Sequence, residues 1–414
     1  MGANLLPSFD SDAWIPFKPD DTFAAKLYKT GENGAAALAV GLQDSGEDMG
    51  RWSCEIEGIK AGGSYNFHIE YTMQNVLYEH ETVQILISWK NMNGEFTLRE
   101  YAYNTNKRQD GMTIADKRLT APADAAGFRL DLIVLYAKNA VVSFYNASLV
   151  ITNQHPRRTV KIAATFIKKF QGPEYNLPAA LELTDKAAAE GADVVIFAEM
   201  FMYFGGSYKK PEIAESVPGK TTEIFAKKAV QHGIYIIINI YENDNGRIYN
   251  TSVVIGRDGR IVHKYRKTHI PLGEVDTGVR PGDTINVFDL DFGRCGILIC
   301  WDHYFPEAVR MLAMQGAEIL FVSSIGYTEH ARTYAMNNGV YMAIAGINGP
   351  CPSRIISPGG ELLAHAGSTN EDGYAIAEID LDKRFPEPYM ILGKAGGDTR
   401  HVNLQSMRPS LYKY

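Results

Sequence analysis

The chain has 414 residues, of which 45% are hydrophobic and 21% are charged, and its formal net charge at pH 7 is −7. This composition is typical of a soluble globular protein, and the length gives a soft expectation of two or three domains. A mildly acidic chain without a run of like charge gives no support for nucleic-acid binding, and four scattered cysteines are too few for a disulfide framework.

The first residues contain no basic region followed by a long apolar stretch, so we predict no signal peptide. The sequence also has no run of about 18 apolar residues of the kind that spans a membrane. We therefore expect a cytoplasmic protein with no membrane partner.

Strand patterns dominate the first part of the chain. Short stretches that alternate apolar and polar residues are separated by turns rich in Gly and Asn, which is typical of an antiparallel sandwich. We predict an all-β domain over residues 1–157. Its clearest strands are Ser64–Tyr71, Thr82–Trp89, Phe128–Tyr136 and Ala140–Val150.

After Arg158 the pattern changes to alternating strands and helices, which predicts an α/β layer fold over residues 158–414. Within this domain, the Pro- and Gly-containing tail over residues 385–414 is a candidate arm for contact with a partner subunit. The predicted strands are Val160–Phe166, Val194–Ala198, Ile234–Ile240, Ile319–Ser323 and Met342–Ile347. The predicted helices are Asn176–Glu190, Thr221–His232, Glu307–Gln315 and Ala331–Val340.

The segment around Cys300 carries the strongest chemical signal. An apolar run, Ile297–Ile299, predicts a buried strand that ends at Cys300, and Pro306 precedes a predicted helix. A thiol in this position suits a nucleophile, because backbone N–H groups and the positive end of a helix favour thiolate. The plain alternative is a small buried apolar residue, the commonest fate of a free cysteine.

Two further segments place ionisable residues after predicted strands. Glu199 directly follows the strand Val194–Ala198, and a basic cluster, His263–His269, follows a strand over Thr251–Ile255. The plain alternatives are a carboxylate that turns to solvent and a solvated run of charge.

Four motifs follow one another in the order Glu, Lys, Glu, Cys. They are Phe197-Ala198-Glu199, Arg266-Lys267-Thr268-His269, Gly273-Glu274 with Pro281-Gly282-Asp283, and Cys300-Trp301-Asp302 with Phe305-Pro306-Glu307. Together they resemble the motifs of the nitrilase superfamily of carbon–nitrogen hydrolases, over about residues 159–380. Any one motif would be a weak signal, but four in the right order are a strong one. The resemblance implies a four-layer αββα sandwich, commonly doubled across a homodimer interface, and a reaction that needs no cofactor.

The resemblance also implies a role for each residue. Cys300 would attack an amide carbonyl, and Glu199 would take the thiol proton, pass it to the leaving amine and then activate water. Lys267 and the backbone N–H of Trp301 would stabilise the oxyanion. Glu274 would hold Lys267 and the substrate nitrogen in place.

Other mechanisms fit the sequence less well. A thiolate pair of Cys300 with His269 or His303 is the nearest competitor, but it would leave the motifs around Glu199 and Lys267 unexplained. The histidines have no zinc-site spacing, and the chain has neither a Gly-rich nucleotide motif nor a GxSxG elbow. We therefore predict a site without a metal.

The substrate is less well defined by the sequence. The segment beginning at Cys300 resembles the amidase and N-carbamoyl-amine hydrolase branches, whereas true nitrilases tend to have Glu where Asp302 stands. We expect a small linear amide or N-carbamoyl compound as the substrate. Tyr203, Phe204 and His303 are candidates for lining its pocket, although the aromatic residues could equally be ordinary packing.

The first domain resembles the jelly rolls of carbohydrate-binding modules over about residues 22–152. Exposed aromatic residues in such modules stack on sugars, but Trp52 and Trp89 lie in strand patterns that favour core packing. We therefore prefer a domain that shapes the catalytic pocket or extends an oligomer interface. The alternative function is a glycan-binding protein whose α/β domain is a weakly active scaffold.

Overall fold

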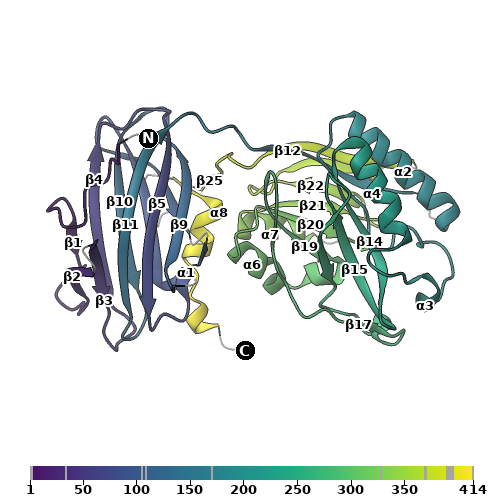
Figure 1. Ribbon diagram of the computed structural model, residues 1–414, viewed down its shortest axis with the longest axis horizontal. Helices are drawn as coiled ribbons and strands as arrows, with labels where there is room; N and C mark the ends of the chain where they lie inside the picture. The colour runs from purple at the N-terminus through teal and green to yellow at the C-terminus, as the bar shows by residue number, and fades with distance from the viewer. Residues whose placement is uncertain are drawn as a thin grey trace. The chain divides into compact units, whose positions relative to one another are not determined.

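A computed structural model describes residues 3–32, 35–103, 106–107, 110–168, 171–326, 329–367, 371–387 and 396–412. The chain divides into two compact units. The first unit contains Met1–Pro156 together with Arg384–Tyr414, and the second contains Arg157–Lys383 (Figure 1).

The first unit is built from two β-sheets that share one hydrophobic core. In spatial order, one sheet contains β1 (Ile15–Phe17), β4 (Met49–Glu57), β10 (Ala125–Leu135), β6 (Val83–Asn91), β7 (Phe96–Ala102), β26 (Gly396–Asp398) and β25 (Pro386–Glu387). The other contains β2 (Lys26–Glu32), β3 (Ala35–Gly41), β11 (Val141–Thr152), β5 (Ser64–Gln74), β9 (Thr113–Thr120) and β8 (Asn106–Lys107). The four predicted strands correspond to β5, β6, β10 and β11, with ends that differ by a few residues.

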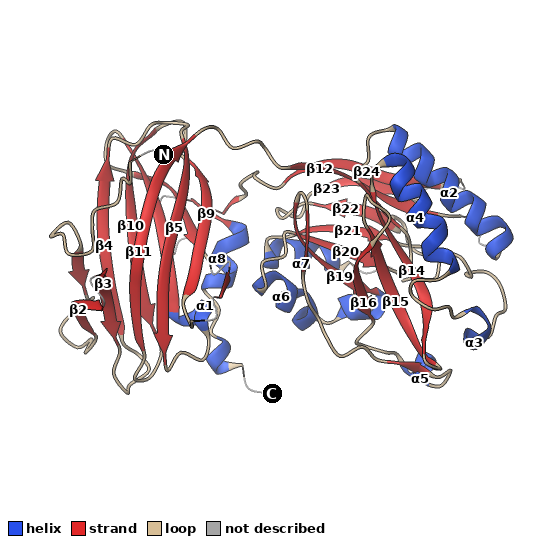
Figure 2. Cartoon of the chain, in the orientation of Figure 1, coloured by secondary structure: helices blue, strands red, loops and turns tan. Residues whose placement is uncertain are grey.

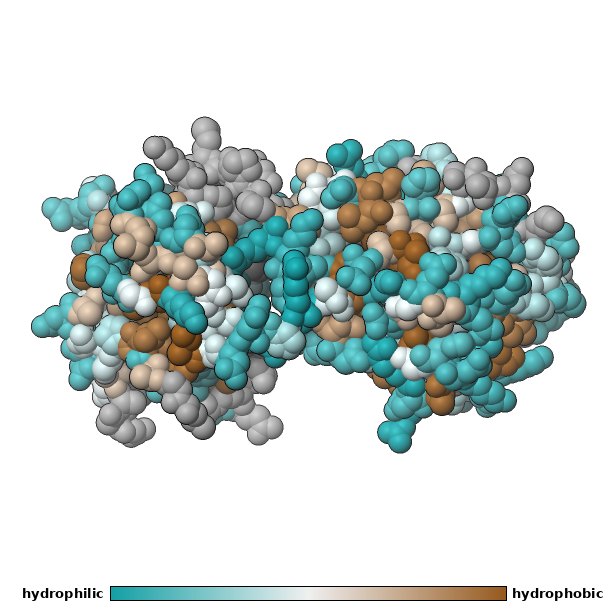
Figure 3. Space-filling model, turned by 90° about the horizontal axis from the view of Figure 1, so that it is seen from above, coloured by the Kyte–Doolittle hydropathy of each residue, from teal (hydrophilic) through white to brown (hydrophobic). Residues whose placement is uncertain are grey.

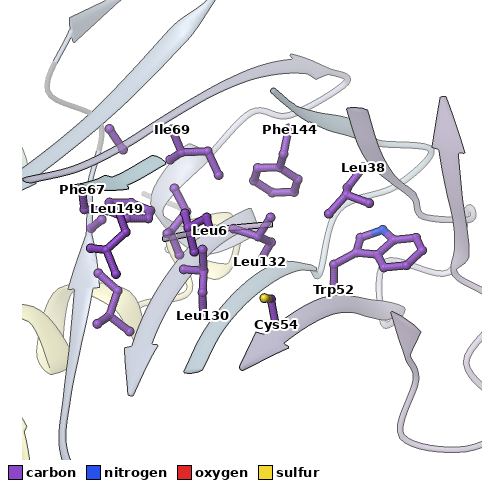
Figure 4. Packing of buried hydrophobic residues seen from close by; sticks show 14 of the residues in the cluster. Leu6, Leu38, Trp52, Cys54, Phe67, Ile69, Leu130, Leu132, Phe144 and Leu149 are labelled. Carbon is purple, nitrogen blue, oxygen red and sulfur yellow. The ribbon is translucent and has the colours of Figure 1, made fainter. Parts of the chain in front are cut away.

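Inward-facing side chains of both sheets fill this core. Phe67 of β5 and Phe144 of β11 meet Leu130 and Leu132 of β10, as Figure 4 shows. Each of these side chains is at most 1% exposed. The alternation of buried and exposed residues along β4 follows from the two-residue period of a strand that packs one face on a core.

Both tryptophans that could have served as a sugar platform are buried. Trp52 is 3% exposed and its indole N–H donates to the carbonyl of Ala39, while Trp89 is fully buried and its N–H donates to Glu100 Oε1 at 2.8 Å. The prediction that these residues pack in the core is confirmed. A buried indole cannot stack on a sugar, so the glycan alternative loses its main support in the sequence.

The C-terminal segment differs from our domain prediction, which placed residues 385–414 in the catalytic domain. The structure groups Arg384–Tyr414 with the first unit, where β26 pairs with β7 in parallel. The following helix, α8 (Thr399–Gln405), contacts β7, and Figure 1 shows it beside the strands of this unit. Beyond it, Arg408 and the Ser410 hydroxyl both bind the buried carboxylate of Glu81. Main-chain pairing and an ion pair to a buried carboxylate therefore attach this segment to the sandwich.

The second unit also contains two sheets, with strands that deliver the candidate site residues. One sheet contains, in spatial order, β16 (Ile261–Arg266), β15 (Arg247–Ile255), β14 (Tyr235–Asp244), β13 (Val194–Ile196), β12 (Thr159–Phe166) and β24 (Gly373–Asp380), with β17 (Val279–Arg280) paired to β15. The other contains β18 (Phe288–Leu290), β19 (Gly293–Ile299), β20 (Ile319–Ser323), β21 (Tyr341–Ala345), β22 (Ser353–Ile356) and β23 (Leu362–Ala366). In the first of these sheets β12, β13 and β14 pair in parallel in that order, and in the other sheet β19, β20 and β21 do the same. Within each set, the carboxyl ends of the strands therefore lie at the same edge of the sheet.

Helices cover these sheets in two pairs. α2 (Pro173–Ala189) and α4 (Lys220–His232) lie side by side in Figure 2 and contact strands of the first of these sheets. α6 (Pro306–Met314) and α7 (His330–Asn338) contact each other, and α7 contacts β21 and β22 of the other sheet. The two sheets contact each other through β12 and β21. The alternating α/β pattern predicted after residue 158 is thus present, and helix ends differ from the predicted ones by at most a few residues.

The surface of both units mixes hydrophilic and hydrophobic residues in the view of Figure 3. Within the described part of the chain, none of the helices has the length and apolar character needed to cross a membrane.

Candidate active site

Glu199 lies just beyond the end of β13, in a buried position. Hydrogen bonding of the Phe197 N–H to the Ile237 carbonyl extends the strand pairing past Ile196. Met200 then adopts a left-handed conformation with φ of 55°, and its N–H donates to Asn239 Oδ1. This sharp turn leaves Glu199 only 1% exposed, so it does not turn to solvent as the plain alternative would require.

Lys267 follows β16 and is also buried. Its Nζ lies 2.9 Å from Glu199 Oε1 and 3.2 Å from both carboxylate oxygens of Glu274. Its N–H donates to the carbonyl of Asn250 on β15, which continues the pairing of the strand. Burial would lower the pKa of this ammonium, but the charges of Glu199 and Glu274 outweigh burial and raise the pKa above its ordinary value. Lys267 is therefore a fixed cation and not part of a solvated charge run.

Glu274 lies on α5 (Leu272–Val275), a single turn between β16 and β17. Burial raises the pKa of Glu274, and the neighbouring carboxylate of Glu199 acts in the same direction, while Lys267 opposes both. Two carboxylates thus share one ammonium. The position of Glu274 agrees with a role in holding Lys267.

Two asparagines that our sequence analysis missed complete this cluster. Asn250 Nδ2 donates to Glu199 Oε1 at 2.8 Å and to Glu274 Oε1 at 3.3 Å. Asn239 Nδ2 in turn donates to Asn250 Oδ1 at 2.9 Å, which orients the Asn250 amide. Both are nearly fully buried within the otherwise apolar strands β14 and β15. A polar amide inside an apolar run was the available signal, because buried amides require partners.

Cys300 follows β19 and begins a short 3₁₀ helix, Cys300–Tyr304. Its φ of 43° lies in the left-handed region, which is uncommon for a residue with a side chain and recurs at functional sites. The carboxylate of Glu199 and the backbone N–H groups of Ile325 and Gly326, which follow β20, lie close enough to the sulfur to shift the pKa of the thiol. The candidate nucleophile, the candidate base and the candidate cation therefore lie near one another, although they are distant in sequence.

The ionisation of Cys300 differs from our expectation of a stabilised thiolate. Burial and the negative charge of Glu199 raise the pKa of the thiol to about 11, and the two backbone N–H groups offset this only in part. The physical reason is that a desolvated site holding a carboxylate disfavours a second negative charge. The resting thiol is therefore protonated at neutral pH, and its activation requires a base.

The two histidines near Cys300 do not form a pair with the thiol. The Nδ1–H of His303 donates to the carbonyl oxygen of Cys300, and burial lowers the pKa of His303 to about 4. His269 binds Asp302 at 2.9 Å and stacks on Phe305. The competing Cys–His mechanism is not supported by these contacts. His303 is 1% exposed and its bond to the Cys300 carbonyl supports the turn at Cys300, while a pocket-lining role for it stays a prediction.

The other predicted pocket residues are partly buried. Tyr203 packs against Met200 and Tyr241, and the carbonyl of Phe204 accepts a hydrogen bond from Asn176 on α2. Trp301 is 40% exposed, with its ring 4.8 Å from that of Tyr304. A pocket-lining role for Tyr203 and Phe204, and an oxyanion contact from the Trp301 N–H, stay predictions.

Asp302 joins the turn at Cys300 to the loop that carries Lys267. Its fully buried Oδ1 accepts the backbone N–H groups of Thr268 and His269, at 3.2 and 2.8 Å. Its Oδ2 accepts the Ile299 N–H at 3.0 Å and the Tyr265 hydroxyl at 2.9 Å. One carboxylate therefore binds the backbone next to Cys300 and the backbone next to Lys267. It thereby helps to set the distance between the sulfur and the ammonium.

We expect Asp302→Asn to lower kcat for amide hydrolysis by about 10- to 100-fold, with little change in KM, because an amide nitrogen would face backbone donors and shift Lys267 relative to Cys300. Steady-state kinetics measure this, with thermal unfolding recorded in parallel. Asp276→Asn, a change of the same kind at an exposed position, is the control. Equal kcat in both variants would contradict a positioning role for Asp302.

The comparisons with known proteins agree with this geometry. A family model described as carbon–nitrogen hydrolase matches residues 162–386. The chain belongs to this family. Omega-amidase NIT2-A of Xenopus laevis is 35% identical over a match of 236 residues, and the match covers 50% of this chain and 83% of that protein. A nitrilase of Pyrococcus abyssi is 35% identical over 225 residues, covering 50% of this chain and 85% of that protein.

Solved structures of the nitrilase superfamily show the same fold. Saccharomyces cerevisiae Nit3 superposes with a TM-score of 0.50 at 23% identity, over 55% of this chain and 93% of that one. A variant of an amidase from Nesterenkonia superposes with a TM-score of 0.50 at 19% identity, over 63% and 98%. The membership that the four motifs indicated is confirmed. Within the described residues of this carbon–nitrogen hydrolase, no group of three or more His, Cys, Asp or Glu is placed to hold a metal ion.

Proposed function

We propose that this carbon–nitrogen hydrolase cleaves a non-peptide C–N bond of a small linear amide or N-carbamoyl compound through a thioester on Cys300. The observation that carries the proposal is the position of one buried carboxylate, Glu199, which lies 2.9 Å from the ammonium of Lys267 and close enough to Cys300 to raise the pKa of the thiol. A protonated thiol beside a carboxylate is the starting state of general-base-assisted attack.

The first half of the reaction forms the thioester. As the sulfur of Cys300 bonds to the carbonyl carbon, the thiol proton passes to Glu199. The hydrogen bonds that Glu199 accepts from Lys267 and Asn250 are both to Oε1, which leaves Oε2 for this proton. The carbonyl oxygen takes the negative charge, which Lys267 and the Trp301 N–H stabilise. Collapse of this intermediate breaks the C–N bond, and the leaving ammonia or amine takes the proton from Glu199.

The second half hydrolyses the thioester. Water attacks the carbonyl carbon and gives a proton to Glu199, and the same oxyanion contacts stabilise the second intermediate. The C–S bond then breaks, the carboxylic acid leaves, and the sulfur regains the proton from Glu199. Through their hydrogen bonds, Glu274 holds Lys267 in position and Asn250 holds Glu199 in position during both halves of the reaction.

Finer features of the architecture belong to the same proposal. We infer layers in the order helix, sheet, sheet, helix for the second unit, supported by the helix pairs that contact each sheet. A jelly-roll topology for the first unit, a homo-oligomeric assembly and a cytoplasmic location are proposed on the sequence arguments given above.

Mass spectrometry of the protein mixed with a panel of small amides, N-carbamoyl compounds and nitriles tests the proposal. We expect ammonia release from at least one member and a transient acyl adduct on the peptide that contains Cys300. Cys351, a second partly buried thiol, is the internal control and should remain unmodified. An adduct on Cys351 alone, or turnover without any adduct on Cys300 after acid quenching, would count against the thioester route.

A further inference from the structure

A second lysine lies beside the candidate active site and forms no ion pair with a carboxylate of the described residues. Lys210 is the first residue of α3 (Lys210–Ile213), in the loop that follows Glu199 along the chain. Its ammonium contacts the hydroxyl of Thr277 and lies 5.3 Å from the ring centroid of Tyr241. No carboxylate of the described residues lies within the 4.0 Å of an ion pair with Lys210.

Both neighbours of Lys210 connect it to the catalytic cluster. The Thr277 hydroxyl also donates to the carbonyl of Glu274, the residue whose carboxylate binds Lys267. The ring of Tyr241 packs with Met200, which directly follows Glu199 in the chain. Lys210 therefore contacts two side chains that in turn contact Glu274 and the residue next to Glu199.

The charge of Lys210 is partly desolvated but not neutralised. Burial lowers the pKa of Lys210, and the nearby cation Lys267 acts in the same direction, while Glu274 opposes them. Its hydrogen-bond partner, a hydroxyl, carries no charge. Because a half-buried ammonium usually has an anionic partner, an unpaired one at the edge of a reaction site is suited to an anion that arrives from outside.

We propose that Lys210 binds a carboxylate of the substrate, at the end remote from the amide that is cleaved. This inference rests on the proposed function and narrows its substrate class to amides that carry a negative charge. An ammonium is a compact point charge that attracts a carboxylate, and it repels an amine. Neutral amides and carbamoylated diamines are therefore expected to be the poorer substrates.

A pair of matched amides tests the inference. One is the monoamide of a short straight-chain dicarboxylic acid, and the other is the neutral amide of the same chain length. For Lys210→Met we expect kcat/KM for the anionic amide to fall by about tenfold or more, mainly through KM, and kcat/KM for the neutral amide to stay within about twofold. Lys210→Arg should retain most of the preference for the anionic amide.

The chain offers a matched control at the preceding residue. Lys209 is 84% exposed and lies 4.0 Å from Glu212, so Lys209→Met removes the same charge from the surface of the loop. We expect this variant to treat both amides as the wild type does. An equal loss for both amides in Lys210→Met would overturn the inference, because Lys210 would then act only through its field on the catalytic cluster. Unchanged kinetics with both amides would overturn it as well.

A binding measurement separates this inference from the proposed function. Calorimetry of the anionic amide with Cys300→Ala, and with Cys300→Ala carrying Lys210→Met, reports anion binding without turnover. We expect an increase in Kd of about tenfold or more on loss of Lys210. If the wild type releases no ammonia from either amide but this difference in Kd is present, the hydrolase proposal fails and the anion site stands. Equal Kd values would refute the anion site whatever the activity.

Discussion

Cys300→Ala is expected to lower kcat for amide hydrolysis by on the order of 10⁵-fold, to the level of the uncatalysed background. The variant has no sulfur to form the thioester, and water alone would have to attack the amide from the same position. Alanine tolerates the left-handed φ of 43° about as poorly as cysteine does, so we expect no change in folding. Ammonia release by the purified variant measures the loss.

Cys351→Ala is the matched control for this experiment, because Cys351 is a partly buried free thiol that lies outside the cluster of Glu199 and Lys267. We expect its kcat to remain within about twofold of the wild-type value. Ammonia release at the wild-type rate by Cys300→Ala would mean that another group performs the attack, and the mechanism would have to be abandoned.

Glu199→Gln is expected to lower kcat by about 10³-fold while making the thiol of Cys300 more acidic. Glutamine can still accept the bonds from Lys267 and Asn250, so the geometry is kept. It cannot accept the thiol proton, so turnover is lost. It also removes the negative charge that, after burial, contributes most to raising the pKa of Cys300 to about 11.

The direction of this pKa change provides a measurement that is independent of turnover. In the wild type the thiolate appears as pH rises toward about 11, so alkylation of Cys300 by iodoacetamide should increase up to that pH. In Glu199→Gln the increase should occur at lower pH, nearer the ordinary thiol value of roughly 8.5. An unchanged or higher pKa in the variant would show that Glu199 does not act on the thiol.

Asn250→Leu would be a less informative change than these two, because it removes the amide donor that Glu199 and Glu274 share and so alters both carboxylates at once. The sharper variants are those that preserve the hydrogen bonds of the cluster and remove one property only. For this reason the glutamine and alanine changes carry the main tests of the mechanism.

Several features of the molecule could be predicted from its sequence because they depend on local pattern. The alternation along Ser64–Tyr71 and the helical run over Thr221–His232 both appear as elements with nearly the predicted ends. The prediction that Glu199 and Cys300 lie just after buried strands agrees with the structure, because an apolar run followed by turn residues marks the end of a strand. Each of these signals is contained in a short stretch of chain.

Other features depended on contacts between distant residues. The pKa of Cys300 is raised because Glu199 shares its buried site, and no local pattern shows that a base and a thiol meet. Asn250 and Asp302 look like ordinary polar residues until strand pairing and the turn at Ile299 bring donors to them. The short strand β26 has no periodic pattern that would assign it to the first unit.

The sequence by itself therefore determined the order of the elements, the family and the three candidate reactive groups, because apolar periodicity and motif order are properties of the chain. Only the tertiary structure decided which charges share a desolvated site and, among the described residues, that Lys210 near this site forms no ion pair. Hydrogen bonding and Coulomb interaction depend on distances in space, and those distances are set when the sheets of the second unit bring their strand ends together.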